Sequence, residues 1–329
     1  MKRSQRVSSE EIESVLITPR RYSGATYTYL QKVALDDDPG FSVGLMSLDK
    51  WLPGGVKRGE MVVIGGRPGT GKSFFINNVL EYNAQKGHTC LMVSAEMTAT
   101  QLGARGFSNN TKIDSARLYA GEVPIDGDEW EKIKQAARVR ADLPVYLIAH
   151  MGTLEKKARR RPRFTIDLVD ATVQYLAERD VIVDIIGIDY LQRMKSSIGL
   201  WQRKDVADEV SGGSKDLALK WSAAVFIGTQ LGRQVEERNT KLPHESDYKE
   251  SGNIEEDGDT LMSIFAPMKY YSQGEIILGT TPERTAQPNQ VFIQIHKQRG
   301  GPSGKSAWCW FDPRFAELRD LEERLAFDG

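Results

Sequence analysis

Gly66-Arg67-Pro68-Gly69-Thr70-Gly71-Lys72-Ser73 is the most informative segment of this 329-residue chain, because it fits the phosphate-loop pattern G-x-x-x-x-G-K-[ST]. The apolar run Met61–Ile64 before it predicts a strand, and a helix is expected from about Lys72, which is the context the pattern requires. Glycines let successive backbone N–H groups turn toward phosphate oxygens, and a helix N-terminus adds partial positive charge. We therefore expect a nucleotide site in which Lys72 reaches the β- and γ-phosphates and the Ser73 hydroxyl binds Mg²⁺.

Short apolar runs alternate with helical patterns on both sides of this motif, which predicts an α/β fold with a mostly parallel central sheet flanked by helices. One predicted helix carries Ile166, Val169, Val173 and Leu176 on a single face. The strands expected to be buried on both faces are Met61–Ile64, Cys90–Ser94, Val145–Ile148, Val183–Ile188 and Ala224–Gly228.

The two ends of the chain have a different character. Residues 1–40 predict an N-terminal arm with short helices, one near Ile12, Val15 and Leu16 and one near Tyr27–Leu35, and we expect residues 41–329 to form the nucleotide-binding domain. At the other end, further strands are expected at Met262–Phe265, Val291–His296 and Ser306–Phe311. The last two predict a C-terminal β-hairpin, followed by a polar helix near Arg314–Leu325.

The composition excludes several classes of protein. Hydrophobic residues make up 40% and charged residues 27% of the chain, so it is not disordered throughout. No apolar run is long enough for a membrane span, and the first residues contain no apolar core of a secretory signal. Cys90 and Cys309 are expected to be reduced and buried, and their spacing does not suit zinc. Because the net charge is −1, nucleic acid could be bound only through local basic patches.

Two carboxylates complete the predicted nucleotide site. Asp189 ends a buried strand run, so its side chain should emerge at the carboxyl edge of the sheet, where ligands of open α/β folds bind. We expect it to orient the metal ion with Ser73, the alternative being a helix cap or surface turn. Glu96 follows the strand Cys90–Ser94 and is expected to activate the attacking water, the alternative being an ordinary carboxylate at a helix start.

Further motifs follow the phosphate loop in a set order. They are Ser94-Ala95-Glu96-Met97 with Gln101, Leu102 and Arg105; Ile188-Asp189-Tyr190-Leu191-Gln192; Thr229-Gln230-Leu231-Gly232-Arg233; Lys249-Glu250-Ser251-Gly252-Asn253-Ile254-Glu255; and His296-Lys297-Gln298-Arg299 with Gly300-Gly301-Pro302-Ser303-Gly304. This ordered series resembles the motifs of the DnaB-type replicative helicases. The resemblance covers roughly residues 41–315 and implies a RecA-like P-loop NTPase motor.

Within the nucleotide site, the resemblance implies one role for each matching residue. Glu96 matches the catalytic glutamate, Asp189 the metal-binding acid and Gln230 the glutamine that senses the γ-phosphate. Arg105 matches an arginine that packs on the adenine. The phosphate loop itself is expected to bind the nucleotide through Gly66, Arg67, Pro68, Gly69, Thr70, Gly71, Lys72 and Ser73.

The resemblance also implies residues that act outside their own subunit. Lys297 and Arg299 match a basic pair presented to the γ-phosphate of a neighbour, and their two-residue spacing on a strand puts both on one face. The alternative is a solvated cationic strand end. Lys249, Glu250 and Gly252 match a loop that touches the DNA backbone.

The implied activity is that of an ATP-dependent ring helicase, usually a hexamer, that moves 5′ to 3′ along single-stranded DNA with ATP and Mg²⁺ as cofactors. Expected partners are single-stranded DNA, further copies of the chain, primase, a helicase loader and other replisome proteins, with no membrane. We expect a protein of the bacterial cytosol, encoded by a phage or plasmid and lacking the family's N-terminal collar. The alternatives are a recombinase filament and an ATP-switched DNA-binding regulator that does not translocate.

Two basic segments are candidate DNA contacts. Arg193–Gly213 is polar and is expected to be a loop in the ring channel that binds phosphates without sequence preference through Arg193, Lys195, Arg203 and Lys204. Residues 156–163 carry six cations, which predict either a solvated loop or an electrostatic guide for DNA.

Overall fold

The computed structural model describes residues 8, 12, 15–35, 40–150, 163–251 and 253–321, without the side chains of 249–251. The chain divides into two compact units, Met1–Gly40 and Phe41–Gly329. The first unit contains helix α2 (Pro19–Ala34), which begins earlier than the predicted helix at Tyr27. Thr18 caps it, its side chain accepting a hydrogen bond from the Arg21 N–H, and proline suits the first helical position. Helix α2 contains no buried residue.

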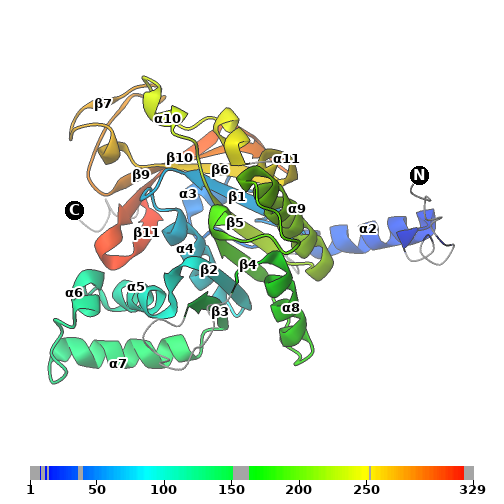
Figure 1. Cartoon of the computed structure of the whole chain (residues 1–329), viewed down its shortest axis with the longest axis horizontal. Helices are drawn as coiled ribbons and strands as arrows, with labels where there is room; N and C mark the ends of the chain where they lie inside the picture. Colours follow the sequence, from blue (N-terminus) through cyan, green and yellow to red (C-terminus); the bar gives the residue numbers. More distant parts are fainter. Residues whose placement is uncertain are drawn as a thin grey trace. The chain divides into compact units, whose positions relative to one another are not determined.

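The second unit is built on a nine-stranded sheet with the order β11-β10-β9-β6-β1-β5-β4-β2-β3 (Figure 1). The six strands from β6 to β3 in this order run parallel. The parallel arrangement was predicted for five of them, and β6 joins them although it was expected among the C-terminal strands. They are β1 (Met61–Gly66), β2 (Cys90–Thr98), β3 (Val145–His150), β4 (Ile185–Asp189), β5 (Ala224–Gln230) and β6 (Thr260–Phe265).

Helices cover both faces of this sheet, because alternate residues of each central strand face opposite sides. On one side, Val62 and Ile64 of β1 pack in a core with helix α4 (Lys72–Ala84). On the other, Met61 and Val63 share a core with α8 (Ile166–Ala177) and α9 (Arg203–Trp221). The predicted helix over Ile166–Leu176 is confirmed as α8.

The close packing of α4 against the sheet depends on Gly187. A Cβ atom at this position would lie 2.7 Å from Ile76 Cγ2 and 2.9 Å from Leu80 Cδ1. Because α4 can therefore lie directly on β4, the residues at its N-terminus are held beside the end of that strand. A larger residue at position 187 would force Ile76 and Leu80 of α4 to shift.

The C-terminal strands confirm the predicted hairpin and correct the predicted helix. Strands β9 (Gln290–Gln298) and β10 (Lys305–Asp312) pair antiparallel, and β9 also pairs antiparallel with β6. Within the predicted helix Arg314–Leu325, the chain instead forms a 3₁₀ turn (Pro313–Phe315) and strand β11 (Glu317–Asp320). Pairing with β10 stabilises this strand, as do hydrogen bonds from the Met46 and Ser47 N–H groups to Asp320. Neither contact can be read from the local sequence. Residues 322–329 lie outside the described part.

The remaining elements connect these strands. The helices are α3 (Met46–Asp49), α5 (Ala99–Thr111), α6 (Ser115–Ala120), α7 (Asp128–Ala141), α10 (Gln234–Glu237) and α11 (Ile254–Asp257). Further 3₁₀ turns are η1 (Leu191–Arg193), η2 (Glu245–Ser251) and η3 (Pro267–Lys269), and β7 (Ile276–Ile277) pairs with β8 (Arg284–Thr285). Cys90 and Cys309 are buried free thiols, as expected. None of the helices in the described ranges is long and apolar enough to span a bilayer.

Candidate active site

The phosphate loop connects the end of β1 to the start of α4, as the motif predicts. Gly69 and Gly71 have φ angles of +73° and +106°, in the left-handed region where a Cβ atom is strained. Thr70 closes the turn, since its hydroxyl donates a hydrogen bond to Arg67 O at 2.9 Å. Lys269, from the distant turn η3, donates to Pro68 O. The loop is thus held in shape from within and from a neighbouring segment.

Lys72 is a buried cation in the centre of this loop. Its Nζ donates to Gly66 O at 2.8 Å and to Arg67 O at 3.1 Å, and the residue is only 9% exposed. Burial lowers the pKa of this amine to about 8, against the opposing effect of the Asp189 and Glu96 carboxylates. A desolvated ammonium group is strongly attracted to an anion, so the loop suits a phosphate group.

Asp189 and Ser73 meet at the start of α4, although they are far apart in the sequence. The Ser73 hydroxyl donates to Asp189 Oδ1 at 3.0 Å. Asp189 is fully buried, and its Oδ2 has no hydrogen-bond partner among the described residues. Burial raises the pKa of this carboxyl. A hydroxyl beside a buried, incompletely satisfied carboxylate fits Mg²⁺, which is commonly held by one or two protein oxygens together with substrate phosphates and water.

Glu96 lies near the same edge of the sheet, because β2 is the neighbour of β4. Its charge acts on both Lys72 and Asp189, and its side chain is 44% exposed. Arg193 Nη2 lies 4.0 Å from Glu96 Oε1. An exposed carboxylate beside the phosphate loop has access to water, as a general base requires.

Gln230 is placed next to the phosphate loop by strand pairing, since it is in register with Gly66. Gln192 fixes the position of Gln230, a role that was not predicted from the sequence. Gln192 Oε1 accepts a hydrogen bond from the Gln230 N–H at 3.1 Å, and its Nε2 donates to Thr229 Oγ1 at 2.9 Å. The only sequence signal for Gln192 was its place in the motif after Asp189. The end of β5 and the segment after β4 therefore form one hydrogen-bonded unit.

Arg105 reaches the site from α5. Its guanidinium carbon lies 4.4 Å from the ring centroid of Phe74, the residue after Ser73. Phe74 in turn contacts Phe311 edge to face, with ring centroids 5.0 Å apart. Burial lowers the pKa of Arg105, opposed by the charges of Asp189 and Glu96. A flat cation stacked on an aromatic ring beside the phosphate loop is suitable for packing on a base.

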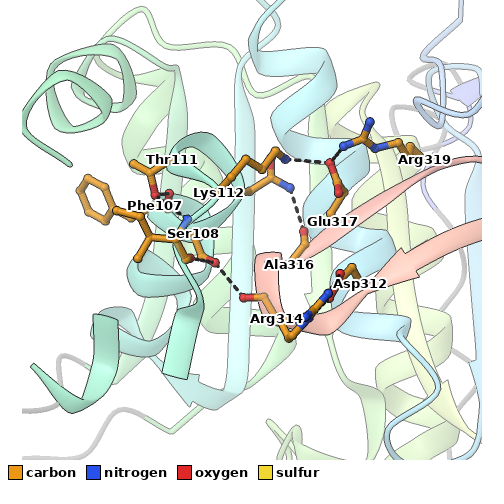
Figure 2. A network of polar contacts seen from close by, with 11 residues as sticks. Phe107, Ser108, Thr111, Lys112, Asp312, Arg314, Ala316, Glu317 and Arg319 are labelled. Atoms are coloured by element: carbon orange, nitrogen blue, oxygen red, sulfur yellow. Dashed lines mark hydrogen bonds and ion pairs between the residues drawn. The ribbon is translucent and has the colours of Figure 1, made fainter. Parts of the chain in front are cut away.

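A polar network fastens α5 to the turn between β10 and β11, and sequence reasoning did not foresee it. Figure 2 shows Ser108 directed at the Arg314 carbonyl, with its hydroxyl donating at 2.9 Å. Asn109 Nδ2 donates to Ala316 O at 2.8 Å, and Lys112 forms an ion pair with Glu317 at 2.7 Å. These contacts hold the helix that carries Arg105 at a set position relative to Phe311.

The Arg67 side chain is directed away from the inside of the phosphate loop. Its Nη1 donates to Leu231 O at 2.8 Å, and its Nε forms a 3.0 Å ion pair with Glu236 of α10. This ion pair also lowers the pKa of Glu236. Arg67 thus contributes its backbone to the loop, while its side chain braces the loop against α10.

Lys297 and Arg299 lie at the amino-terminal end of the parallel strands, whereas the phosphate loop lies at their carboxyl end. Lys297 Nζ donates to Glu255 O at 2.6 Å, and Arg299 Nη1 forms a 3.0 Å ion pair with Asp259. Asp259 also accepts from the N–H of Met61, the first residue of β1. Because β1 extends about 17 Å from Met61 to Gly66, Arg299 is remote from its own phosphate loop. The Arg299 side chain is nevertheless 57% exposed.

The structure describes only part of the predicted DNA-contact loop. The backbone of Lys249 and Glu250 belongs to turn η2, but their side chains and the whole of Gly252 are not described. The residue before them, Tyr248, is fully buried, and its hydroxyl donates to Met262 O at 2.5 Å. The loop therefore begins from an anchored core residue.

The second predicted DNA segment, Arg193–Gly213, is a loop only up to residue 202. Arg193 is the last residue of turn η1 and Lys195 lies in the loop after it, whereas Arg203 and Lys204 form the first turn of α9. The prediction of a loop through Gly213 is wrong, because Ala207 and Val210 are buried in the core and stabilise a helix in a polar sequence. Residues 151–162, with most of the six-cation run, lie outside the described part, and Arg163 Nη2 donates to Ser196 O at 3.2 Å.

Two solved structures share this fold. A structure titled "ATPase Domain of G40P" aligns with 93% of this chain and all of that one, with a TM-score of 0.77 and 21% identity. A second, titled "The Structure Of A DnaB-Like Replicative Helicase And Its Interactions With Primase", aligns with 91% of this chain and 66% of its own, with a TM-score of 0.75 and 22% identity. At these identities the similarity establishes the fold alone, which is the RecA-like arrangement expected from the sequence.

Curated relatives extend the comparison to sequence. The chain is 28% identical to "Replicative DNA helicase DnaB" of Rickettsia prowazekii over 87% of its length and 59% of the relative's. It is also 28% identical to the protein of that name in Pasteurella multocida, over 87% of this chain and 56% of the relative. The chain thus spans less than two thirds of these relatives. The model of the family described as "DnaB-like helicase C terminal domain" matches residues 40–320. The chain therefore belongs to the DnaB-like helicase C-terminal domain family.

Proposed function

We propose that this chain is an ATP-hydrolysing motor that assembles into a homo-hexameric ring. The ring moves 5′ to 3′ along single-stranded DNA and separates the strands of a duplex. The observation that carries this proposal is the division of the site. Lys72, Ser73 and Asp189 lie together at the carboxyl end of the parallel strands, while Arg299 is exposed at the amino-terminal end. Such a site is complete only where two subunits meet.

Each residue has a distinct task in this proposal. Lys72 and the neighbour's Arg299 neutralise the charge on the transferred phosphoryl group, and Glu96 accepts a proton from the attacking water. Ser73 and Asp189 would hold Mg²⁺, which stabilises the phosphate charge when bound. Gln230 senses the γ-phosphate, and Arg105 packs on the adenine. Gln192 transmits the position of Gln230 to the segment after β4 through the hydrogen bonds between these two glutamines.

The proposed DNA contacts bind the charged phosphates of the DNA backbone, so they do not distinguish one base sequence from another. They are Arg193, Lys195, Arg203 and Lys204 before and at the start of α9, with Lys249, Glu250 and Gly252 in the loop after Tyr248. Primase, a helicase loader and other replisome proteins are the further partners we propose, in the cytosol of a bacterium and with a phage or plasmid as the source.

A Glu96→Gln variant tests this function by separating binding from chemistry. Because only water activation is lost, we expect ATP turnover stimulated by single-stranded DNA to fall by about 10²- to 10⁴-fold, with nucleotide binding retained. ATPase assays and the unwinding of a forked duplex measure both effects. Glu131→Gln, at an exposed carboxylate on α7, serves as the control. Turnover at the wild-type rate in Glu96→Gln, or wild-type protein that hydrolyses ATP without separating strands, would contradict the proposal.

The N-terminal arm is proposed to dock on a neighbouring subunit. Helix α2 has 16 residues and buries none of them, and a helix of this length is marginal in water without a packing partner. Val15 and Leu16 are 76% and 61% exposed. Deleting residues 1–35 should leave a folded motor that assembles poorly, as measured by light scattering with an ATP analogue. A variant with Ile12→Ser, Val15→Ser and Leu16→Ser should behave in the same way. Unchanged assembly mass in both would refute the docking.

A further inference from the structure

Trp201 has the most exposed large apolar side chain among the described residues, at 95%. It lies between turn η1 and helix α9, and Ile198 in the same segment is 77% exposed. An indole ring is large and apolar, and tryptophan is on average a highly buried residue. Such an exposed ring is therefore a candidate contact for a ligand.

A hydrogen-bonded turn presents this side chain. The hydroxyl of the buried Ser196 accepts from the N–H groups of Ile198 at 3.2 Å and Leu200 at 2.9 Å. The Ser197 N–H donates to Glu209 Oε1 of α9 at 2.6 Å. The turn is thus attached to the helix that follows it, and Trp201 directly precedes the cap of that helix, Gln202. Part of the entropic cost of ordering a binding loop is met before any ligand arrives.

The charge around Trp201 indicates the class of ligand. The segment Arg193–Lys204 contains four cations and no carboxylate. Arg203 and Lys204 are exposed and follow Trp201 by two and three residues, ahead of the first carboxylate, Asp205. Carboxylates line a pocket that includes Ile198, but Trp201 does not line this pocket. A protein partner would have to offset these cations with its own acids. Single-stranded nucleic acid supplies one phosphate for every base and a flat π face on each base, which suits interleaved cations and an aromatic ring.

The segment is also connected to the nucleotide site. It begins just after β4, which ends at Asp189, and Gln192 is hydrogen bonded to both Gln230 and Thr229. Trp201 is therefore joined through a short, braced segment to residues beside the phosphate loop. A ligand held by Trp201 would be sensitive to the state of that loop.

We propose that Trp201 stacks on a base of single-stranded DNA while Arg203 and Lys204 contact the flanking phosphates. The inference rests on the proposed function. It adds a contact with a base to proposed DNA contacts that otherwise reach only the phosphates of the DNA backbone. Because every base has a π face, stacking binds DNA without selecting its sequence. It would hold the strand in register between the phosphate contacts of successive subunits.

The test compares two DNA strands of equal length, an oligo-dT and an abasic deoxyribose-phosphate strand, by fluorescence anisotropy with full-length protein and an ATP analogue. Trp201→Ala should weaken binding of oligo-dT by roughly 5- to 150-fold and leave binding of the abasic strand unchanged. Trp201→Phe should retain most of the affinity for oligo-dT. The dependence of affinity on salt should be unchanged in Trp201→Ala, because no phosphate contact is lost, and reduced in Arg203→Ala. Tyr175→Ala, at a 56% exposed aromatic on α8, is the matched control.

The outcomes separate this inference from the function on which it rests. Wild-type protein that binds neither strand would overturn the proposed function and the stacking together. Wild-type protein that binds oligo-dT while Trp201→Ala binds it equally well would overturn the stacking alone. An equal loss on both strands, or altered assembly of Trp201→Ala without DNA, would assign Trp201 to a contact between copies of the chain and would also overturn it.

Discussion

Lys72→Ala is expected to reduce ATP turnover at least about 100-fold, because it removes a cation that stabilises the charge of the transferred phosphoryl group. Nucleotide affinity should fall as well. Lys72 is 9% exposed, and its ammonium group donates hydrogen bonds to the neutral carbonyls of Gly66 and Arg67, so its charge is poorly neutralised before a phosphate arrives. ATPase assays and titration with a fluorescent nucleotide measure the two losses separately.

The control for Lys72 is Lys86→Ala, at an exposed position just beyond the other end of α4, where the ammonium lies 4.3 Å from the Tyr82 ring. This variant should turn over ATP as the wild type does. Thermal unfolding of both variants shows whether either change affects the fold. Wild-type turnover in a folded Lys72→Ala protein would exclude the phosphate loop as the site of chemistry.

Arg299→Ala should keep nucleotide affinity but lose most turnover, since arginine fingers in phosphoryl transfer contribute about 10³- to 10⁵-fold in rate. The fold should tolerate the change. Asp259, the partner of Arg299, keeps an ion pair with Lys215 at 2.7 Å and a hydrogen bond from the Met61 N–H. The affinity of Arg299→Ala for nucleotide, measured beside its rate of hydrolysis, distinguishes a lost catalytic group from a lost binding group.

Mixing two inactive variants tests whether Arg299 acts on a neighbour. In a ring that contains both, an Arg299→Ala subunit has an intact phosphate loop and its Lys72→Ala neighbour supplies an intact Arg299. Such interfaces should hydrolyse ATP, so activity should return on mixing, and differently tagged subunits establish that exchange has occurred. Without recovery in co-assembled rings, a titration of Arg299→Ala into wild type decides the matter. A linear fall in activity would then assign Arg299 to its own subunit.

The local parts of the site were predictable because each depends on a short pattern. The phosphate loop needs glycines at set spacings, and Gly69 and Gly71 have the positive φ angles that explain them. Buried parallel strands appear as short apolar runs, so β1 and β5 were found near their observed bounds. Strand β2 continues beyond the predicted end at Ser94 to Thr98. The prediction that Val145–Ile148 is buried on both faces is wrong, because β3 is an edge strand with Tyr146 and Leu147 exposed. Asp189 was placed at the carboxyl edge by the same reasoning.

Pairings between distant residues could not be found in this way. The ion pair of Arg67 with Glu236 joins positions 169 residues apart, and it explains why this loop arginine is directed away from the phosphate site. The strand Glu317–Asp320 forms because β10 offers it a partner, and α9 begins at Arg203 because its apolar face packs against the core. Propensity over a few residues is overridden when long-range contacts bury the same segment.

Sequence patterns therefore established the phosphate loop, the parallel sheet, the hairpin and the family, since all of these depend on residue spacing along the chain. The tertiary structure alone showed that Asp189 meets Ser73, that Gln192 braces Gln230, and that Arg299 lies at the far edge of the sheet from Lys72. The physical reason is that hydrogen bonds and ion pairs act over a few ångströms in space. Only the order and direction of strands in the sheet decide which distant residues come within that range.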